Sequence, residues 1–194
     1  MSLVKILEEL QWKQLLHDER YHKDIWILCV QNRAKHMILH LNKYSGKLFE
    51  ALREKDNDKL CSHVVDAFII NFSYANIFQI PIYKKYENMS NINDFNALIK
   101  SHKSIDSNIT DILIDYTIAV GKMAKTIESL DHIEQHNYRS NLNEYVFNIF
   151  EILLKLSAYL DIKDIEMIIE KRLFYVESKN MNFHRFGNYS SGYL

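Results

Sequence analysis

The sequence predicts an all-α protein, a bundle of helices, and three observations support this fold class. The chain of 194 residues holds 4 glycines and 1 proline, whereas sheet proteins of this size need many turns, which draw on both residue types. Apolar residues make up 47% of the chain, which is enough for a sizeable core. Apolar residues also recur at helical spacing through most of the sequence. Together these features predict long helices joined by few connections.

The first half of the sequence contains three apolar patterns of this kind. The first covers residues 3–15, and the charged run 17–23 is expected to interrupt it. The second extends through residues 25–52. The third covers residues 60–80 and should stop there, because Pro81 lacks a backbone N–H and disfavours helix in the residue before it.

The second half repeats this alternation of helices and polar connections. Residues 83–104 are rich in Lys, Asn and Ser, and Ser90 to Asp94 offer capping side chains for one short helix. Helical spacing resumes after residue 105 and again after residue 142, and Asp161 precedes a last helix with acidic residues in its first turn. The predicted organisation is an N-terminal helical repeat at 1–82, a linker with a short helix at 83–104, a C-terminal helical repeat at 105–178 and an irregular tail at 179–194.

Two segments indicate a weak internal duplication. The segment around Gly46 aligns with the segment around Gly121, and each precedes a second apolar helix pattern in which Ile80 falls on Ile162. Two helix pairs that each expose an apolar face can bury these faces against one another. Helix-rich sequences can also align through apolar patterning alone, so that alternative stays open.

Charge and composition exclude some classes of partner. A net charge of -1 and a pI near 6.8 give neither the basic footprint of a nucleic-acid-binding protein nor a polybasic membrane patch. The longest apolar runs are too short to span a bilayer, and the N-terminus enters a charged helix without a signal-peptide apolar region. Cys29 and Cys61 lie in apolar stretches and are expected to be buried, reduced thiols. We therefore expect a cytoplasmic protein with no nucleic-acid and no membrane partner.

The duplicated frame resembles the MazG-like all-α nucleoside triphosphate pyrophosphohydrolases, whose relatives include dimeric dUTPases. The resemblance covers residues 25–80 and 105–186. It rests on these residues: His40, Leu41, Lys43, Gly46, Leu48, Glu50, Ala51 and Asp66 in the first copy, Gly121, Glu144, Asn148 and residues 160–166 in the second, and loosely Lys171, Asn180 and Arg185. Such a resemblance implies a helical fold, a nucleotide ligand, a possible homodimer, and Mg²⁺ held by four carboxylates from two neighbouring helices.

The four carboxylate positions of that family are mostly occupied by other residues here. They read Tyr44, Lys47, His63 and Asp66 in the first copy, and Ala119, Lys122, Tyr145 and Asn148 in the second. One carboxylate cannot hold Mg²⁺ in a dedicated site without help from the substrate. The sequence therefore predicts that metal-dependent hydrolysis is lost in both copies.

Three function classes follow from this comparison. The leading one is a divergent, non-catalytic MazG-like protein that acts through nucleotide binding or protein association, with no catalytic residue assigned. Its candidate phosphate ligands are Lys47, Lys122 and Arg185, and Glu50 with Asp66 is the candidate for a reduced metal site.

The second class is a Mg²⁺-dependent nucleotide pyrophosphohydrolase, and the third is a structural helical scaffold. The enzyme would use acids that the alignment misplaces, such as Asp111, Asp115, Glu144 and Glu151. Two histidine pairs at helical spacing, His36 with His40 and His132 with His136, lack further ligands at zinc-like spacing.

Overall fold

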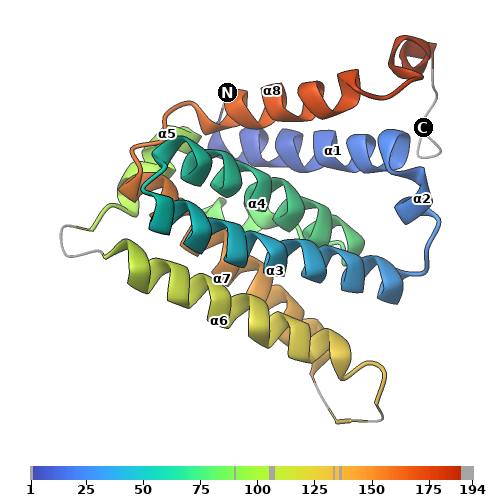
Figure 1. Cartoon of the computed structure of the whole chain (residues 1–194), viewed down its shortest axis with the longest axis horizontal. Helices are drawn as coiled ribbons and strands as arrows, with labels where there is room; N and C mark the ends of the chain where they lie inside the picture. Colours follow the sequence, from blue (N-terminus) through green and yellow to red (C-terminus); the bar gives the residue numbers. More distant parts are fainter. Residues whose placement is uncertain (1, 90, 105–107, 133, 136, 189–194) are drawn as a thin grey trace.

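The protein is an all-α bundle (Figure 1). The computed structural model describes residues 2–89, 91–104, 108–132, 134–135 and 137–188, and these residues form no strand. Their α-helices are α1 Leu3–Tyr21, α2 Lys23–Trp26, α3 Val30–Glu54, α4 Asn57–Ile77, α5 Phe95–Ser101, α6 Ile109–Glu128, α7 Tyr138–Tyr159 and α8 Ile165–Ser178. Two 3-10 helices, η1 Ile82–Tyr86 and η2 Phe183–Asn188, accompany them.

Four long helices form the central bundle as two antiparallel hairpins, α3–α4 and α6–α7 (Figure 1). Helix α3 packs against α6 and α4 packs against α7, so each hairpin buries its apolar face on the other. An aromatic cluster of Phe68, Phe72, Phe95 and Phe150 fills the contact between α4, α5 and α7. Helices α1 and α8 lie side by side and cover α4.

The two hairpins have related backbone features at aligned positions. Helix α4 is followed by a left-handed Gln79, and the Ile80 amide donates to Ala75 O at 2.9 Å. Helix α7 is followed by a left-handed Asp161, and the Ile162 amide donates to Ser157 O, also at 2.9 Å. A left-handed residue after a helix turns the chain so that the following amide can donate to a carbonyl that the helix end leaves unpaired.

The hairpins also meet at aligned positions. The Tyr116 hydroxyl donates to Leu41 O at 3.3 Å between α6 and α3, and Tyr116 stands at the alignment position of Leu41. Contact between equivalent positions is what a two-fold relation between two copies would produce.

The predicted interruption at residues 17–23 is present but narrower than expected, because α1 continues to Tyr21 and only His22 separates it from α2. Polar partners on other helices explain how its charged residues can be buried. The Asp18 carboxylate accepts from Ser73 Oγ at 2.6 Å and from Gln14 Nε2 at 2.8 Å. His17 Nδ1 lies 2.9 Å from Glu177 Oε1 on α8.

The single helical pattern expected over residues 25–52 is divided in the structure. The short helix α2 ends at Trp26, and α3 begins at Val30. Between them Cys29 precedes the first residue of α3 and is exposed, and Cys61 is half-buried, so the prediction of two buried thiols is wrong. Both thiols are free. The apolar residues 27–29 do not indicate burial here, because they form the connection in which the chain turns from α2 into α3.

The short helix predicted within residues 83–104 is confirmed as α5, and Asp94 caps it, its Oδ1 accepting from Ala97 N at 2.7 Å. The predicted irregular tail forms η2 over Phe183–Asn188, and the part of that prediction at 189–194 lies outside the described residues. Among the described residues, every helix is too short or too polar to cross a bilayer.

Candidate functional site

The candidate site lies where α3, α4 and α8 meet and is centred on Asp66 of α4. The Asp66 side chain is only 10% exposed. Arg172 of α8 donates two hydrogen bonds to the Asp66 carboxylate, from Nε to Oδ1 at 2.7 Å and from Nη2 to Oδ2 at 3.1 Å. A guanidinium matches the geometry of a carboxylate in this bidentate way, which makes the pair strong and specific.

Tyr44 of α3 forms the floor of the site. Its side chain is buried, close to the Asp66 carboxylate. Burial raises the pKa of the Tyr44 hydroxyl, and the nearby carboxylate of Asp66 raises it further, so the hydroxyl keeps its proton. His63 of α4 packs beside it, with ring centroids 6.1 Å apart.

Two lysines of α3 stand over the Tyr44 ring. Lys43 Nζ lies 4.6 Å and Lys47 Nζ lies 5.9 Å from the ring centroid. Burial lowers the pKa of the Lys43 ammonium, and the nearby charges of Lys47 and Arg172 lower it further, against the opposing effect of Asp66. Three cations therefore share a small region with one buried carboxylate, which favours an anionic ligand.

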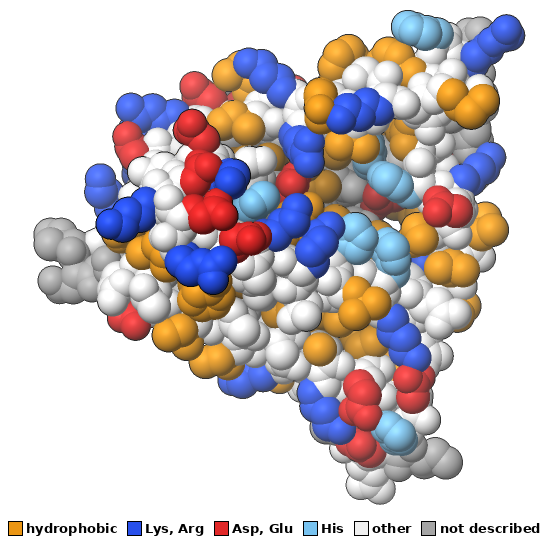
Figure 2. Space-filling view, viewed as in Figure 1, with side chains coloured by type: hydrophobic (Ala, Val, Ile, Leu, Met, Phe, Trp, Pro, Cys, Tyr) orange, Lys and Arg blue, Asp and Glu red, His pale blue; other side chains and the backbone are white. Residues whose placement is uncertain are grey.

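His63 is neutral at pH 7 in this environment. Burial lowers the pKa of its imidazole, the Lys47 charge adds to that effect, and the carboxylates of Asp66 and Glu50 oppose it. Its buried Nδ1 has no hydrogen-bond partner. Figure 2 shows lysine, arginine and histidine side chains gathered on this face of the molecule, with acidic side chains to one side of them.

The donor set of this site does not fit Mg²⁺. Both oxygens of Asp66 already accept from Arg172, so a metal ion would have to displace the guanidinium. Glu50 is exposed on α3. Within the described part of the chain, no group of three or more His, Cys, Asp or Glu side chains is arranged to hold a metal ion. The Glu50–Asp66 metal site stays a prediction.

The aligned positions of the second hairpin do not form a comparable cluster. Ala119 is buried, Tyr145 is half-buried, and Lys122 and Asn148 are exposed. The acids proposed for an enzyme are dispersed too: Asp111, Asp115 and Glu144 are exposed, whereas Glu151 pairs with Lys85 at 2.7 Å.

The structure does not bring the three predicted phosphate ligands together. Lys47 lies in the C-terminal half of α3, and Lys122 lies on α6 in the other hairpin. Arg185 is exposed in η2, which follows the C-terminal end of α8 at the opposite end of the molecule from the C-terminus of α3 (Figure 1). Lys47 alone belongs to the cationic cluster.

Sequence reasoning missed Arg172. The periodicity of residues 165–178 places it on a helix, but its partner Asp66 is 106 residues away. Only the docking of α8 on α4 shows the pairing. Lys43 was visible as a motif residue, and its spacing to Lys47 on one helical face was the signal that could have nominated it.

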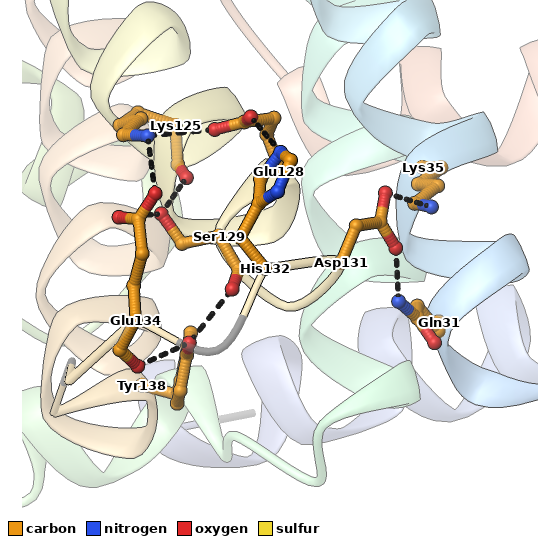
Figure 3. A network of polar contacts seen from close by, with 9 residues as sticks. All are labelled: Gln31, Lys35, Lys125, Glu128, Ser129, Asp131, His132, Glu134 and Tyr138. Carbon is orange, nitrogen blue, oxygen red and sulfur yellow. Dashed lines mark hydrogen bonds and ion pairs between the residues drawn. The ribbon is translucent and has the colours of Figure 1, made fainter.

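A separate polar network fixes the connection between α6 and α7 (Figure 3). Lys125 Nζ binds Glu128 at 2.7 Å and Glu134 at 3.2 Å, and Ser129 Oγ donates to Glu134 at 3.1 Å. The Tyr138 hydroxyl donates a hydrogen bond to Ser129 O at 2.9 Å. These contacts satisfy the end of α6 and are structural.

The same connection is tied to the first hairpin. The Asp131 carboxylate accepts from Gln31 and from Lys35 at 2.5 Å each, which joins this loop to the first turns of α3 (Figure 3). His132 pairs with Glu128 at 2.8 Å, whereas its expected partner His136 lies outside the described residues. The histidine thus belongs to a salt-bridged loop.

Comparison with known proteins adds no relative: no family model, no curated protein and no solved structure matches the chain.

Proposed function

We propose that this protein is a divergent, non-catalytic MazG-like protein that binds a phosphate-bearing ligand, a nucleotide, on the face formed by α3, α4 and α8. The observation that carries the proposal is the convergence of Lys43, Lys47 and Arg172 around one buried carboxylate, Asp66. Of these cations, Lys47 stands at a position where the resembled family has a carboxylate. The left-handed caps at Gln79 and Asp161, and the meeting of aligned positions at Tyr116, support the duplication on which this resemblance rests.

Ligand binding at this site should not require a metal. Lysine and arginine neutralise phosphate charge directly, and three cations are available here. Titration of ATP and of inorganic tripolyphosphate by calorimetry, in EDTA and in Mg²⁺, tests this. Binding in EDTA supports the proposal, and binding that appears only with Mg²⁺ contradicts it.

Charge reversal at Lys47 is the first mutational test. We expect Lys47→Glu to weaken tripolyphosphate binding by about tenfold or more, because it replaces an attractive charge by a repulsive one close to the ligand. Lys122→Glu is the matched control, since Lys122 stands at the aligned position of the other hairpin and is exposed. Its expected effect is less than about twofold because exposed, distant charges are screened. Equal losses of tripolyphosphate affinity in both variants would contradict a binding site on this face.

The enzyme alternative has its own assay. Pyrophosphate release from a panel of nucleoside triphosphates with Mg²⁺ or Mn²⁺ should not be detected. Pyrophosphate release that EDTA abolishes would overturn the proposal of a non-catalytic protein. The dispersed acids of α6 and α7 would then be the candidates for the metal site.

Protein association is the second candidate, and exposed apolar side chains favour it. Leu39 of α3 is 66% exposed, and Ile114 and Ile118 of α6 are 44% and 50% exposed. Large exposed apolar side chains can mark a surface that binds another protein when they form one patch. Light scattering coupled to gel filtration distinguishes a homodimer from a monomer.

A further inference from the structure

A polar stripe on α3 extends the cationic site toward the N-terminal half of that helix. His36, His40, Lys43 and Lys47 follow one another at spacings of four, three and four residues, which places them along one face. At 1.5 Å per residue the stripe is about 16 Å long. Histidines occupy one end, and the lysines that stand over Tyr44 occupy the other.

His40 and Lys43 join the two ends of the stripe. Lys43 Nζ lies 3.3 Å from His40 Nδ1. An ammonium can only donate, so Nδ1 accepts and the His40 imidazole is neutral in this state. The His36 ring lies behind it, with centroids 4.6 Å apart.

The groups around His40 come from several elements, and cationic ones predominate. His36 and Lys43 belong to α3 itself. His22, from the junction of α1 and α2, acts on it as well, and the His22 ring lies tilted against His17 with centroids 5.1 Å apart and Asp24 nearby. Asp66 of α4 and Arg172 of α8 act on its neighbour Lys43.

Burial, followed by the charges of Lys43, His36 and His22 in that order of effect, lowers the pKa of the His40 imidazole to about 4. At pH 7 the imidazole carries no charge. An anion bound beside Lys43 would reverse the sign of the local potential, and it would compete with His40 for the Lys43 ammonium.

We propose that His40 is a further residue of the anion site and that binding of a phosphate-bearing ligand draws a proton from solvent onto its imidazole. The hydrogen bond from Lys43 to His40 breaks, Lys43 turns to the anion, and Nδ1 takes the proton to form an imidazolium. No other bond changes. The inference rests on the proposed function, and it makes ligand affinity rise as pH falls.

Inorganic sulfate is the probe for the test, because it stays doubly charged over the working range whereas phosphates change charge there. Imidazole NMR signals assigned to His40 give its pKa with and without saturating sulfate. We expect the pKa of His40 to rise by about one unit, with sulfate binding about tenfold tighter in the acidic limit.

Two glutamine variants separate this residue from the other titrating histidines. His40→Gln keeps an acceptor for Lys43 and should lose most of the tightening of sulfate binding between pH 5.5 and pH 3.5, the range in which a pKa that rises from about 4 to about 5 titrates. His132→Gln is the control, since that histidine pairs with Glu128 in the polar network of the second hairpin, and it should keep the tightening.

The outcomes distinguish the two proposals. Sulfate that binds without moving the pKa of His40 overturns the proton linkage and leaves the anion site in place. An identical pH dependence in His40→Gln and in the unmodified protein has the same meaning. Absence of sulfate and tripolyphosphate binding at every pH overturns the anion site and the linkage together.

Discussion

The two helical hairpins share the helix-end geometry at Gln79 and Asp161 and place different chemistry at aligned positions. In α3–α4 the side chains of Tyr44, Lys47, His63 and Asp66 converge. In α6–α7 the aligned side chains are buried alanine, half-buried tyrosine, and exposed lysine and asparagine. The shared features are helix ends and contact positions, which depend on backbone geometry more than on side-chain identity.

The difference between the hairpins also depends on what covers each of them. Helix α8 covers α4 and supplies Arg172 to Asp66. The second hairpin is covered by α5, and by Lys85 of η1, which pairs with Glu151 and stands 5.5 Å from the Phe147 ring centroid. Similar helix ends therefore do not imply a second site, because α8 completes the site in the first hairpin.

The largest expected effect concerns Asp18, which is buried against the first hairpin alone. Burial raises the pKa of its carboxyl to about 6, against the lowering effect of the hydrogen bond from Ser73. A folded-state pKa above the unfolded value of 3.8 means that the folded state holds the proton more tightly. The contribution of Asp18 is thus most favourable at about pH 3 and below, and it declines by about 3 kcal/mol as pH rises from about 3 to about 7.

Asp18→Asn should remove this loss and stabilise the protein above pH 6. Ser73 Oγ can still donate to the amide oxygen, and the new amide can donate to Gln14 Oε1, a buried acceptor without a partner. Urea unfolding at pH 4 to 7.5 measures the difference in unfolding free energy between the variant and the unmodified protein. The contributions of His22 and His40 are the same in both proteins, so they cancel in this difference. A difference that does not change with pH would contradict the prediction, and exposed Asp24→Asn serves as the control.

The next effect compares one ion pair from each hairpin. Arg172→Met leaves Asp66 largely buried without its partner and should cost about 2 kcal/mol of unfolding free energy. Lys85→Met breaks the Lys85–Glu151 pair, whose side chains are 36% and 34% exposed, and should cost less than about 0.5 kcal/mol. Both are measured by urea unfolding at pH 7.

A second substitution tests the reason for the larger cost. Asp66→Asn placed in the Arg172→Met background should recover part of the lost stability, since an amide needs no guanidinium. Equal costs for Arg172→Met and Lys85→Met would show that the covering helix does not distinguish the two hairpins.

The sequence was informative where local rules decide the structure. Pro81 predicted the end of α4 within a few residues, and Asp94 predicted the start of α5. It failed where a tertiary partner decides, as at Asp18, whose burial depends on Ser73 of α4. The site shows the same division: Lys47 follows from a motif, whereas Arg172 becomes part of the site only through the docking of α8.

The smallest expected effect tests the equivalence of the hairpins directly, at Gly46 and Gly121. Both glycines lie inside helices, and a Cβ added at either meets no heavy atom within 4 Å. Alanine should therefore stabilise each helix by about 0.5 to 1 kcal/mol, and the two gains should add because the sites are independent. Urea unfolding of both single variants and of the double variant measures this. Gly121→Ala could raise the unfolding free energy while Gly46→Ala loses tripolyphosphate binding. That result would mean that a ligand approaches α3 closely at Gly46. The hairpins would then differ in function at the aligned glycines.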